Sequence, residues 1–105
     1  MWDKVIIGAI VIIIGLIAGI VGKITYDHLV KRKNELHAKD VILTDNETVS
    51  EETLKEFFKD VPTFKNRFSS FYVNENNQVF KMEDSDEVDA ELKDKLDRNK
   101  GIIIL

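Results

Sequence analysis

The sequence predicts one N-terminal transmembrane α-helix followed by a small α+β domain, and three observations lead to this fold class. Residues 5–22 form a run of 18 amino acids without a polar side chain. Residues 41–105 contain strand and helix patterns in the order β-α-β-β-α-β. The two parts also differ in charge, because residues 1–40 carry 6 basic and 4 acidic side chains whereas residues 41–105 carry 9 and 15.

The apolar run is predicted to cross a lipid bilayer as one helix over residues 5–24, after a short flank of residues 1–4. It contains 12 Ile, Val or Leu residues, 4 Gly and 2 Ala. At a rise of about 1.5 Å per residue the run spans about 27 Å, close to the thickness of a bilayer core. A cleaved signal sequence is the main alternative, although its apolar stretch is normally only about 7–15 residues long. An unusually apolar core helix or a β-rich run is the other alternative, but a helix in water should show a polar face and this run has none.

The residues that flank the run fit the two surfaces of a membrane. Trp2 and Tyr26 carry amphipathic rings that favour headgroup regions, and Lys4 and Lys23 can extend outward from either end. Five basic residues follow the run up to Lys39, and only Lys4 precedes it. The positive-inside rule therefore predicts an outer N-terminus and a C-terminal domain in the cytoplasm or its topological equivalent.

Small residues are predicted to form a packing stripe along this helix. The stripe consists of Gly8, Gly15, Ala18, Gly19 and Gly22. Small side chains let a second helix approach closely in lipid, so the predicted partners are the bilayer and other membrane-protein subunits or a second copy of the chain. The alternative interpretation is that glycine is simply common in membrane helices.

Residues 25–40 are predicted to continue the helix into water as a charged stalk. This segment lacks Pro and Gly and has only a thin apolar pattern. A small acidic α+β domain then occupies residues 41–105.

The first half of this domain is predicted to contain a strand and an amphipathic helix. Residues 41–43 form a short apolar run that is typical of a buried strand. Thr48 and Glu51 have the spacing of a capping box. Apolar residues then follow at helical spacing, at Leu54, Phe57, Phe58 and Val61. Pro62 ends the predicted helix.

The second half is predicted to contain a hairpin, a helix and a last strand. Residues 70–73 and 78–82 are strand-like and are separated by a turn rich in Asn. Asp84 is predicted to cap the second helix, and Gly101 suits the position after its end. Ile102–Leu105 is predicted to be a buried strand, with a docking tail as the alternative. This order indicates a ferredoxin-like split βαβ sandwich with both helices on one face, or otherwise an irregular α+β hairpin domain.

Composition and motifs exclude several kinds of chemistry. The net charge of −6 on residues 41–105 disfavours nucleic acid, because that binding depends on neutralising phosphates with Lys and Arg. The chain has no cysteine, and His28 and His37 lack the spacing of paired ligands on one helical face. The acidic run of residues 83–89 lacks the central Gly of a calcium loop. We therefore expect no metal, cofactor, small-molecule substrate or enzymatic activity.

Aromatic residues are concentrated between residues 57 and 80, and most are expected in the core. Phe64, Phe68 and Tyr72 are the candidates for an exposed partner surface. These features predict a single-pass structural or accessory subunit of a larger membrane assembly, in a cell or in a membrane-containing virion. The alternative is a small membrane-bound regulator or inhibitor, such as a lysis or immunity factor.

Overall fold

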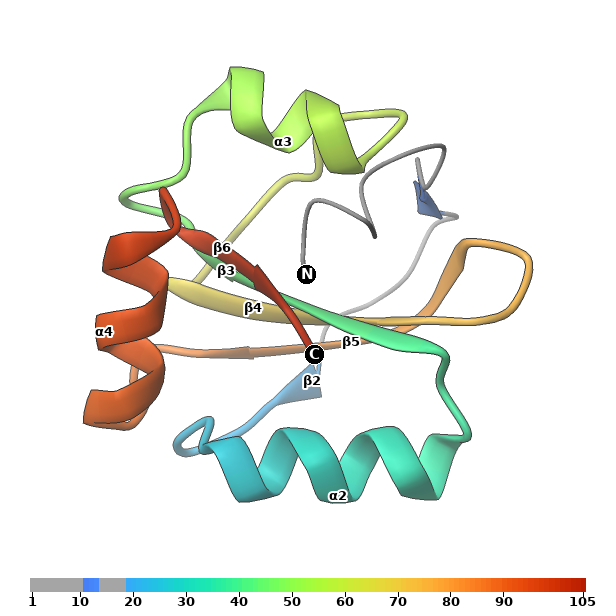
Figure 1. Ribbon diagram of the computed structural model, residues 1–105, viewed down its shortest axis with the longest axis horizontal. Coiled ribbons are helices and arrows are strands. Elements are labelled where there is room, and N and C mark those ends of the chain that lie inside the picture. The colour runs from blue at the N-terminus through green and yellow to red at the C-terminus, as the bar shows by residue number, and fades with distance from the viewer. Residues whose placement is uncertain (1–10, 14–18) are drawn as a thin grey trace.

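The computed structural model describes residues 11–13 and 19–105, which form an α+β domain around one mixed sheet (Figure 1). The strands are β1 (Ile12–Ile13), β2 (Gly19–Ile20), β3 (Asp40–Asp45), β4 (Phe68–Val73), β5 (Gln78–Ser85) and β6 (Ile102–Ile104). Their order is β1-β5-β4-β3-β6, and β2 also pairs with β5. The helices of the described part are α2 (Tyr26–Leu36), α3 (Glu51–Phe57) and α4 (Ala90–Arg98).

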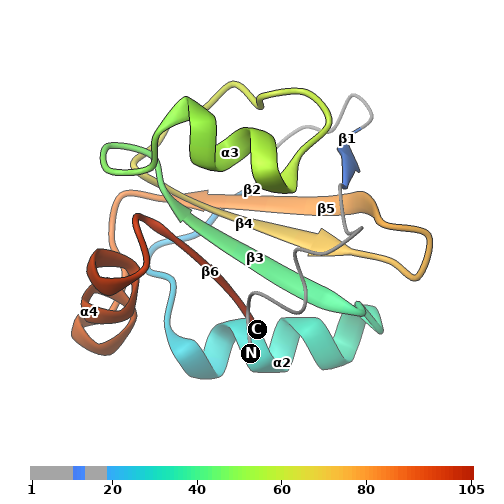
Figure 2. The same ribbon diagram turned by 45° about the horizontal axis from the view of Figure 1, so that its top comes forward.

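The helices cover both faces of the sheet, with α3 on one side and α2 and α4 on the other (Figures 1 and 2). Each face has its own core. The α3 core includes Ile42, Leu54, Phe58, Phe71 and Met82. The α2–α4 core includes Leu29, Leu43, Tyr72, Leu92 and Leu96. Every residue of β4 is buried, because its side chains alternate between these two cores.

The predicted transmembrane helix is wrong. In the described part of this segment, β1 and β2 are strands that pair in parallel with β5 through Ile12↔Gln78 and Gly19↔Glu83. No helix in the described part of the chain is long and apolar enough to cross a membrane. The predicted membrane localisation, with an outer N-terminus and a cytoplasmic C-terminal domain, is wrong for the same reason. Hydropathy misled the prediction because Ile and Val, which dominate the run, suit a strand as well as an apolar helix.

The predicted glycine stripe and interfacial anchors fall only partly within the described residues. Several of them lie outside the described residues, namely Trp2, Lys4, Gly8, Gly15 and Ala18. Gly19 lies in β2, and Gly22 lies in the bend that follows it. Lys23 precedes α2, and Tyr26 is its first residue.

The predicted stalk contains a helix that packs on the domain. Thr25 is the N-cap of α2, because its Oγ1 accepts a hydrogen bond from the His28 amide at 3.0 Å. The helix ends at Leu36, and its C-cap His37 has a left-handed φ of 54°. Leu29 is completely buried in the α2–α4 core. The thin apolar pattern of this segment is therefore the narrow face that contacts the sheet.

The ferredoxin-like arrangement is also wrong, although the βαββαβ order of elements occurs after α2. β3 pairs directly and antiparallel with β4, and β6 joins the other edge of β3. The helices α3 and α4 lie on opposite faces rather than on one face (Figure 2). Element order does not determine the face on which a helix packs, because β4 offers apolar side chains to both.

Helix starts differ from the predicted caps by a few residues. Ser50, not Thr48, caps α3, and Asp89, not Asp84, caps α4. Asp84 instead lies within β5, opposite Ser69. The C-terminal apolar run forms β6 and pairs with β3, as the buried-strand prediction requires.

Gly101 links α4 to β6 in a conformation that side chains disfavour. Its φ is +87°, and a Cβ atom there would lie 2.7 Å from the Val49 amide nitrogen. Its own amide donates to the Leu96 carbonyl at 2.8 Å. The end of α4 therefore depends on glycine both for backbone freedom and for close approach to the turn after β3.

Gly101→Ala is expected to lower the free energy of unfolding by about 2 kcal/mol or more, since a left-handed backbone alone costs about 1–2 kcal/mol for an L-residue. Urea denaturation measures the effect. Gly22→Ala is the matched control, because a Cβ at Gly22 meets no atom within 4 Å. Equal stability of the two variants would contradict the assigned backbone at Gly101.

Candidate functional site

The candidate site lies where β3 ends and β4 begins, and it is organised around the buried carboxylate of Asp45. The Asp45 side chain is fully buried although it ends β3 at a turn. Oδ1 accepts the Glu47 amide at 3.2 Å, and Oδ2 accepts the Thr48 hydroxyl at 3.1 Å. These contacts fix the turn of residues 45–48, because a buried carboxylate needs several donors to offset its lost hydration.

Arg67 supplies the opposite charge from the residue just before β4. Its Nε and Nη2 donate to Oδ1 and Oδ2 of Asp45, each at 3.2 Å. The guanidinium also lies 5.0 Å from the centroid of the Phe68 ring. Lys93 of α4 lies farther from the carboxylate, with Nζ 3.9 Å from Oδ2. Arg67 is thus held in one orientation by a paired hydrogen bond and an aromatic ring.

The charge state of Asp45 follows from two opposing effects. Burial favours the neutral acid, but hydrogen bonds from Arg67, the Glu47 amide and Thr48 outweigh it and lower the pKa of Asp45 below its usual value. The carboxylate is therefore ionised under neutral conditions, and it pairs with the guanidinium.

A row of polar side chains crosses the neighbouring face of the sheet. Thr44, Ser69 and Asp84 are cross-strand partners on β3, β4 and β5 and are almost completely buried. Ser69 Oγ donates to Asp84 Oδ1 at 2.8 Å, and Asn46 Nδ2 donates to Ser69 Oγ at 3.0 Å. Thr44 Oγ1 donates to Asn46 Oδ1 at 2.6 Å. Hydrogen bonds to Thr44 and Ser69 of this row therefore fix the orientation of the Asn46 side chain.

Asp84 differs from Asp45 because, among residues 11–13 and 19–105, no lysine or arginine is bonded to its carboxylate. Burial raises the pKa of Asp84, the hydrogen bond from Ser69 lowers it, and the negative charge of Asp86 raises it further, with a net upward shift. Ionisation of Asp84 therefore destabilises the folded state, whereas ionisation of Asp45 stabilises it.

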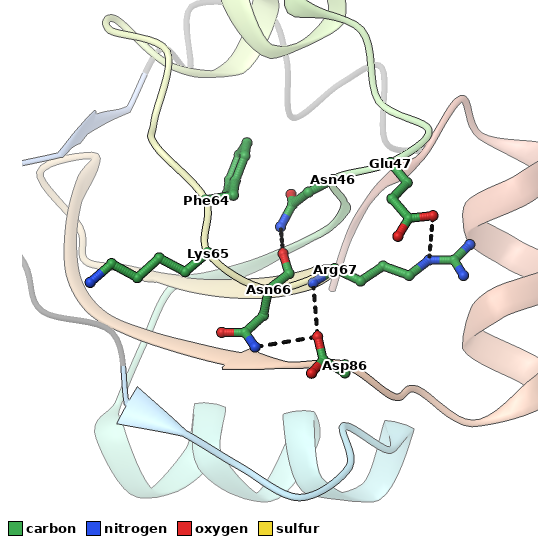
Figure 3. Close-up of a pocket in the computed structure, with 7 residues that line it drawn as sticks. All are labelled: Asn46, Glu47, Phe64, Lys65, Asn66, Arg67 and Asp86. Atoms are coloured by element: carbon green, nitrogen blue, oxygen red, sulfur yellow. Dashed lines mark hydrogen bonds and ion pairs between the residues drawn. The ribbon is translucent and has the colours of Figure 1, made fainter.

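An open pocket of about 450 Å³ is lined by Asn46 and by residues of the neighbouring segments (Figure 3). It is lined by Asn46, Glu47, Phe64, Lys65, Asn66, Arg67 and Asp86. Three chain segments meet here: the turn after β3, the irregular segment before β4 and the residue after β5. Asn46 Nδ2 donates to the Asn66 carbonyl at 2.8 Å, and Asn66 Nδ2 donates to Asp86 Oδ1 at 3.3 Å. Hydrogen bonds therefore join the three chain segments that form the walls of the pocket.

The side chains around the pocket point in different directions. Lys65 extends away from the other lining residues, and the Arg67 guanidinium points towards α4 (Figure 3). Phe64 packs on the α3 core, with its ring centroid 6.1 Å from that of Phe71. The Glu47 side chain is 68% exposed and lies 3.8 Å from Arg67 Nε. The pocket thus combines an aromatic ring with the carboxylates of Glu47 and Asp86.

A second open pocket of about 380 Å³ adjoins the first, and both are lined by Arg67 and Asp86. Its other lining residues are Lys23, Phe68, Glu87, Val88 and Lys93. The two pockets form one polar surface at this end of the sheet, which we call the β4-start surface.

A separate polar cluster joins α2 to the opposite face of the sheet. Glu83 of β5 accepts the Tyr72 hydroxyl at 3.2 Å and lies 3.0 Å from His28 Nε2. Arg32 Nε lies 3.3 Å from the other Glu83 oxygen in an ion-pair contact without hydrogen-bond alignment. Burial and the Glu83 charge raise the pKa of Tyr72, so its hydroxyl stays protonated and can donate. This cluster attaches α2 to the sheet.

Of the three aromatic residues predicted as a partner surface, only Phe64 lines the first pocket. Phe68 is 3% exposed and Tyr72 is completely buried, both within the α2–α4 core. Asn46, Glu47 and Asp86 were not predicted as site residues. The Asn and Asp residues beside the strand ends were a local signal, but their meeting depends on strand pairing.

No group of three or more His, Asp or Glu residues that could hold a metal ion occurs in the described ranges 11–13 and 19–105. Comparisons of the chain with protein-family models, with curated proteins and with solved structures find no match.

Asp45→Asn is expected to lower the free energy of unfolding by about 2 kcal/mol at neutral pH, because a buried acceptor of four hydrogen bonds loses its charge. The folded pKa is lowered, so the charged form stabilises the fold above about pH 4, near the ordinary Asp pKa, and this contribution is lost as the pH falls through the folded pKa. Urea denaturation at several pH values checks both points. Asp94→Asn, at an exposed ion pair of α4, is the control and should change stability little.

Asp84→Asn is expected to raise the free energy of unfolding at neutral pH by an amount on the order of 1 kcal/mol, because the neutral amide still accepts from Ser69. The folded pKa of Asp84 is raised, so the wild-type chain loses stability as the pH rises through that value. The advantage of the variant should vanish in acid, where both side chains are neutral. A stability difference that does not change with pH would contradict this assignment.

Proposed function

We propose that the chain is a non-enzymatic accessory subunit that binds a partner protein through the β4-start surface. The observation that carries this proposal is the set of hydrogen bonds that joins the chain segments around the first pocket, which we call its frame. Asn46, Asn66 and Asp86 hold its three chain segments together, and Asp45 holds Arg67. A surface that is ordered before binding loses little conformational entropy when a partner docks.

The composition of this surface supports a protein partner. It presents a partly buried aromatic ring at Phe64 and a fixed Arg67, and Arg and aromatic residues are over-represented among residues that dominate binding energy. The surface is open rather than an enclosed cavity of the kind that surrounds a small molecule. The net charge of −4 on the chain also disfavours nucleic acid.

Site-specific photo-crosslinking tests the proposal. A photoreactive side chain at Lys65, which is exposed beside the pocket, is expected to give one crosslinked protein in the native cells. The same group at Glu75 is the control, because Glu75 is exposed in the turn that follows the other end of β4. Crosslinking from position 65 but not from position 75 is the expected result.

The stoichiometry of the crosslinked pair distinguishes two roles. Stable one-to-one recovery identifies an accessory subunit, whereas low and inducible recovery identifies a regulator or inhibitor of the same partner. No discrete product from position 65, or equal products from both positions, would contradict partner binding at this surface.

A further inference from the structure

We infer that the first pocket accepts a single basic side chain, arginine or lysine, from an extended segment of the partner. This inference rests on the proposed function and adds the chemistry of what is bound. It follows from the position of the two carboxylates, from the Phe64 ring that lines the same pocket and from the charge of the chain.

The two carboxylates come from different walls of the pocket. Glu47 follows β3, and Asp86 follows β5. Asp86 Oδ1 accepts from Asn66 Nδ2 and from the Arg67 amide at 3.3 and 3.4 Å. Within the described part of the chain no hydrogen bond to Asp86 Oδ2 is found, and Asp86 is exposed. The second oxygen can therefore accept from a ligand without breaking the frame.

Two cations also line the pocket, and Arg67 forms an ion pair with Glu47, whereas within the described residues no ion pair to Asp86 is found. The guanidinium of Arg67 is committed to Asp45 through two hydrogen bonds, and it lies 3.8 Å from Glu47 on the exposed side. The ammonium of Lys65 extends away from the pocket (Figure 3). A ligand carboxylate or phosphate would face Glu47 and Asp86, so an anionic occupant is disfavoured.

Phe64 gives the occupant a second favourable contact. Its ring is only partly buried and lines the same pocket as both carboxylates. A guanidinium or ammonium over an aromatic face is attracted by the ring electrons, and a methylene stem packs on the ring. A pocket of about 450 Å³ has room for one such side chain. The negative charge of the chain would also speed the approach of a basic segment.

Nuclear magnetic resonance titration of the full-length chain tests this inference with defined probes. The first probe is an acetylated, amidated pentapeptide with one arginine between glycines. The second carries citrulline, which keeps the shape without the charge, and the third carries glutamate. We expect millimolar binding of the arginine peptide, with shifts centred on the amides of Glu47, Phe64 and Asp86. The citrulline and glutamate peptides should cause no shifts there.

Substitutions then test whether Glu47 and Asp86 are the carboxylates that bind the arginine peptide. Glu47→Gln and Asp86→Asn are each expected to weaken arginine-peptide binding about threefold, and Asp86→Asn keeps an oxygen that can accept from Asn66. Glu75→Gln is the matched control and should leave binding unchanged. Raising the salt from about 50 to about 300 mM should weaken binding, because exposed charges are screened.

Citrulline binding as strong as arginine binding, or arginine shifts located on another surface, would overturn the inference. Tighter binding of the glutamate peptide would overturn it as well. A partner that crosslinks from position 65 while the arginine peptide does not bind would leave the proposed function standing and reject only the basic occupant. Arginine-peptide binding at the pocket without any crosslinked protein would reject the partner and keep the pocket chemistry.

Discussion

The structure depends on the burial of β3 and β4 on both faces of the sheet. In β4, Phe71 and Tyr72 are adjacent in sequence, point into opposite cores and are completely buried. Each such ring contributes about 2–3 kcal/mol when it leaves water. One layer of helices cannot cover both rings, so α3 must pack on one face while α2 and α4 pack on the other. The same requirement makes α2, which looks like a charged stalk in the sequence, a necessary part of the fold.

Burial on both faces also determines where polar groups must find partners. Asp45, Ser69, Glu83 and Asp84 are buried on the strands, so each must find hydrogen-bond partners within the protein. Asp45 accepts hydrogen bonds from Arg67 and from the turn after β3, and Ser69 accepts one from Asn46. These bonds place the segments around the first pocket in a fixed arrangement. The candidate site is therefore a consequence of satisfying buried polar groups at one end of the central strands.

The sequence predicts the elements of residues 41–105 well, because their signals are local. The apolar spacing around Leu54, the Asn-rich turn before β5 and the C-terminal isoleucines each identify one element. The faces of the sheet are not predictable in this way, since Phe71 and Tyr72 suit either core. The N-terminal run was assigned to a membrane helix because hydropathy does not distinguish a strand of Ile and Val from a helix. Phe64 was predicted, with Phe68 and Tyr72, as part of an exposed partner surface, and it lines the first pocket, whereas Asp86 reaches this pocket only through pairing of β4 with β5.

The two-sided core is tested most directly by nuclear Overhauser effects between side chains of the full-length chain. The account predicts contacts from Leu29 methyl groups to the α2–α4 core around Leu43, and from Leu54 methyl groups to the α3 core around Ile42 and Phe71. It also predicts that Leu29 and Leu54 share no contacts, because the sheet separates them. A Leu29 side chain without contacts to the sheet, or Leu29 and Leu54 in one common core, would contradict the account.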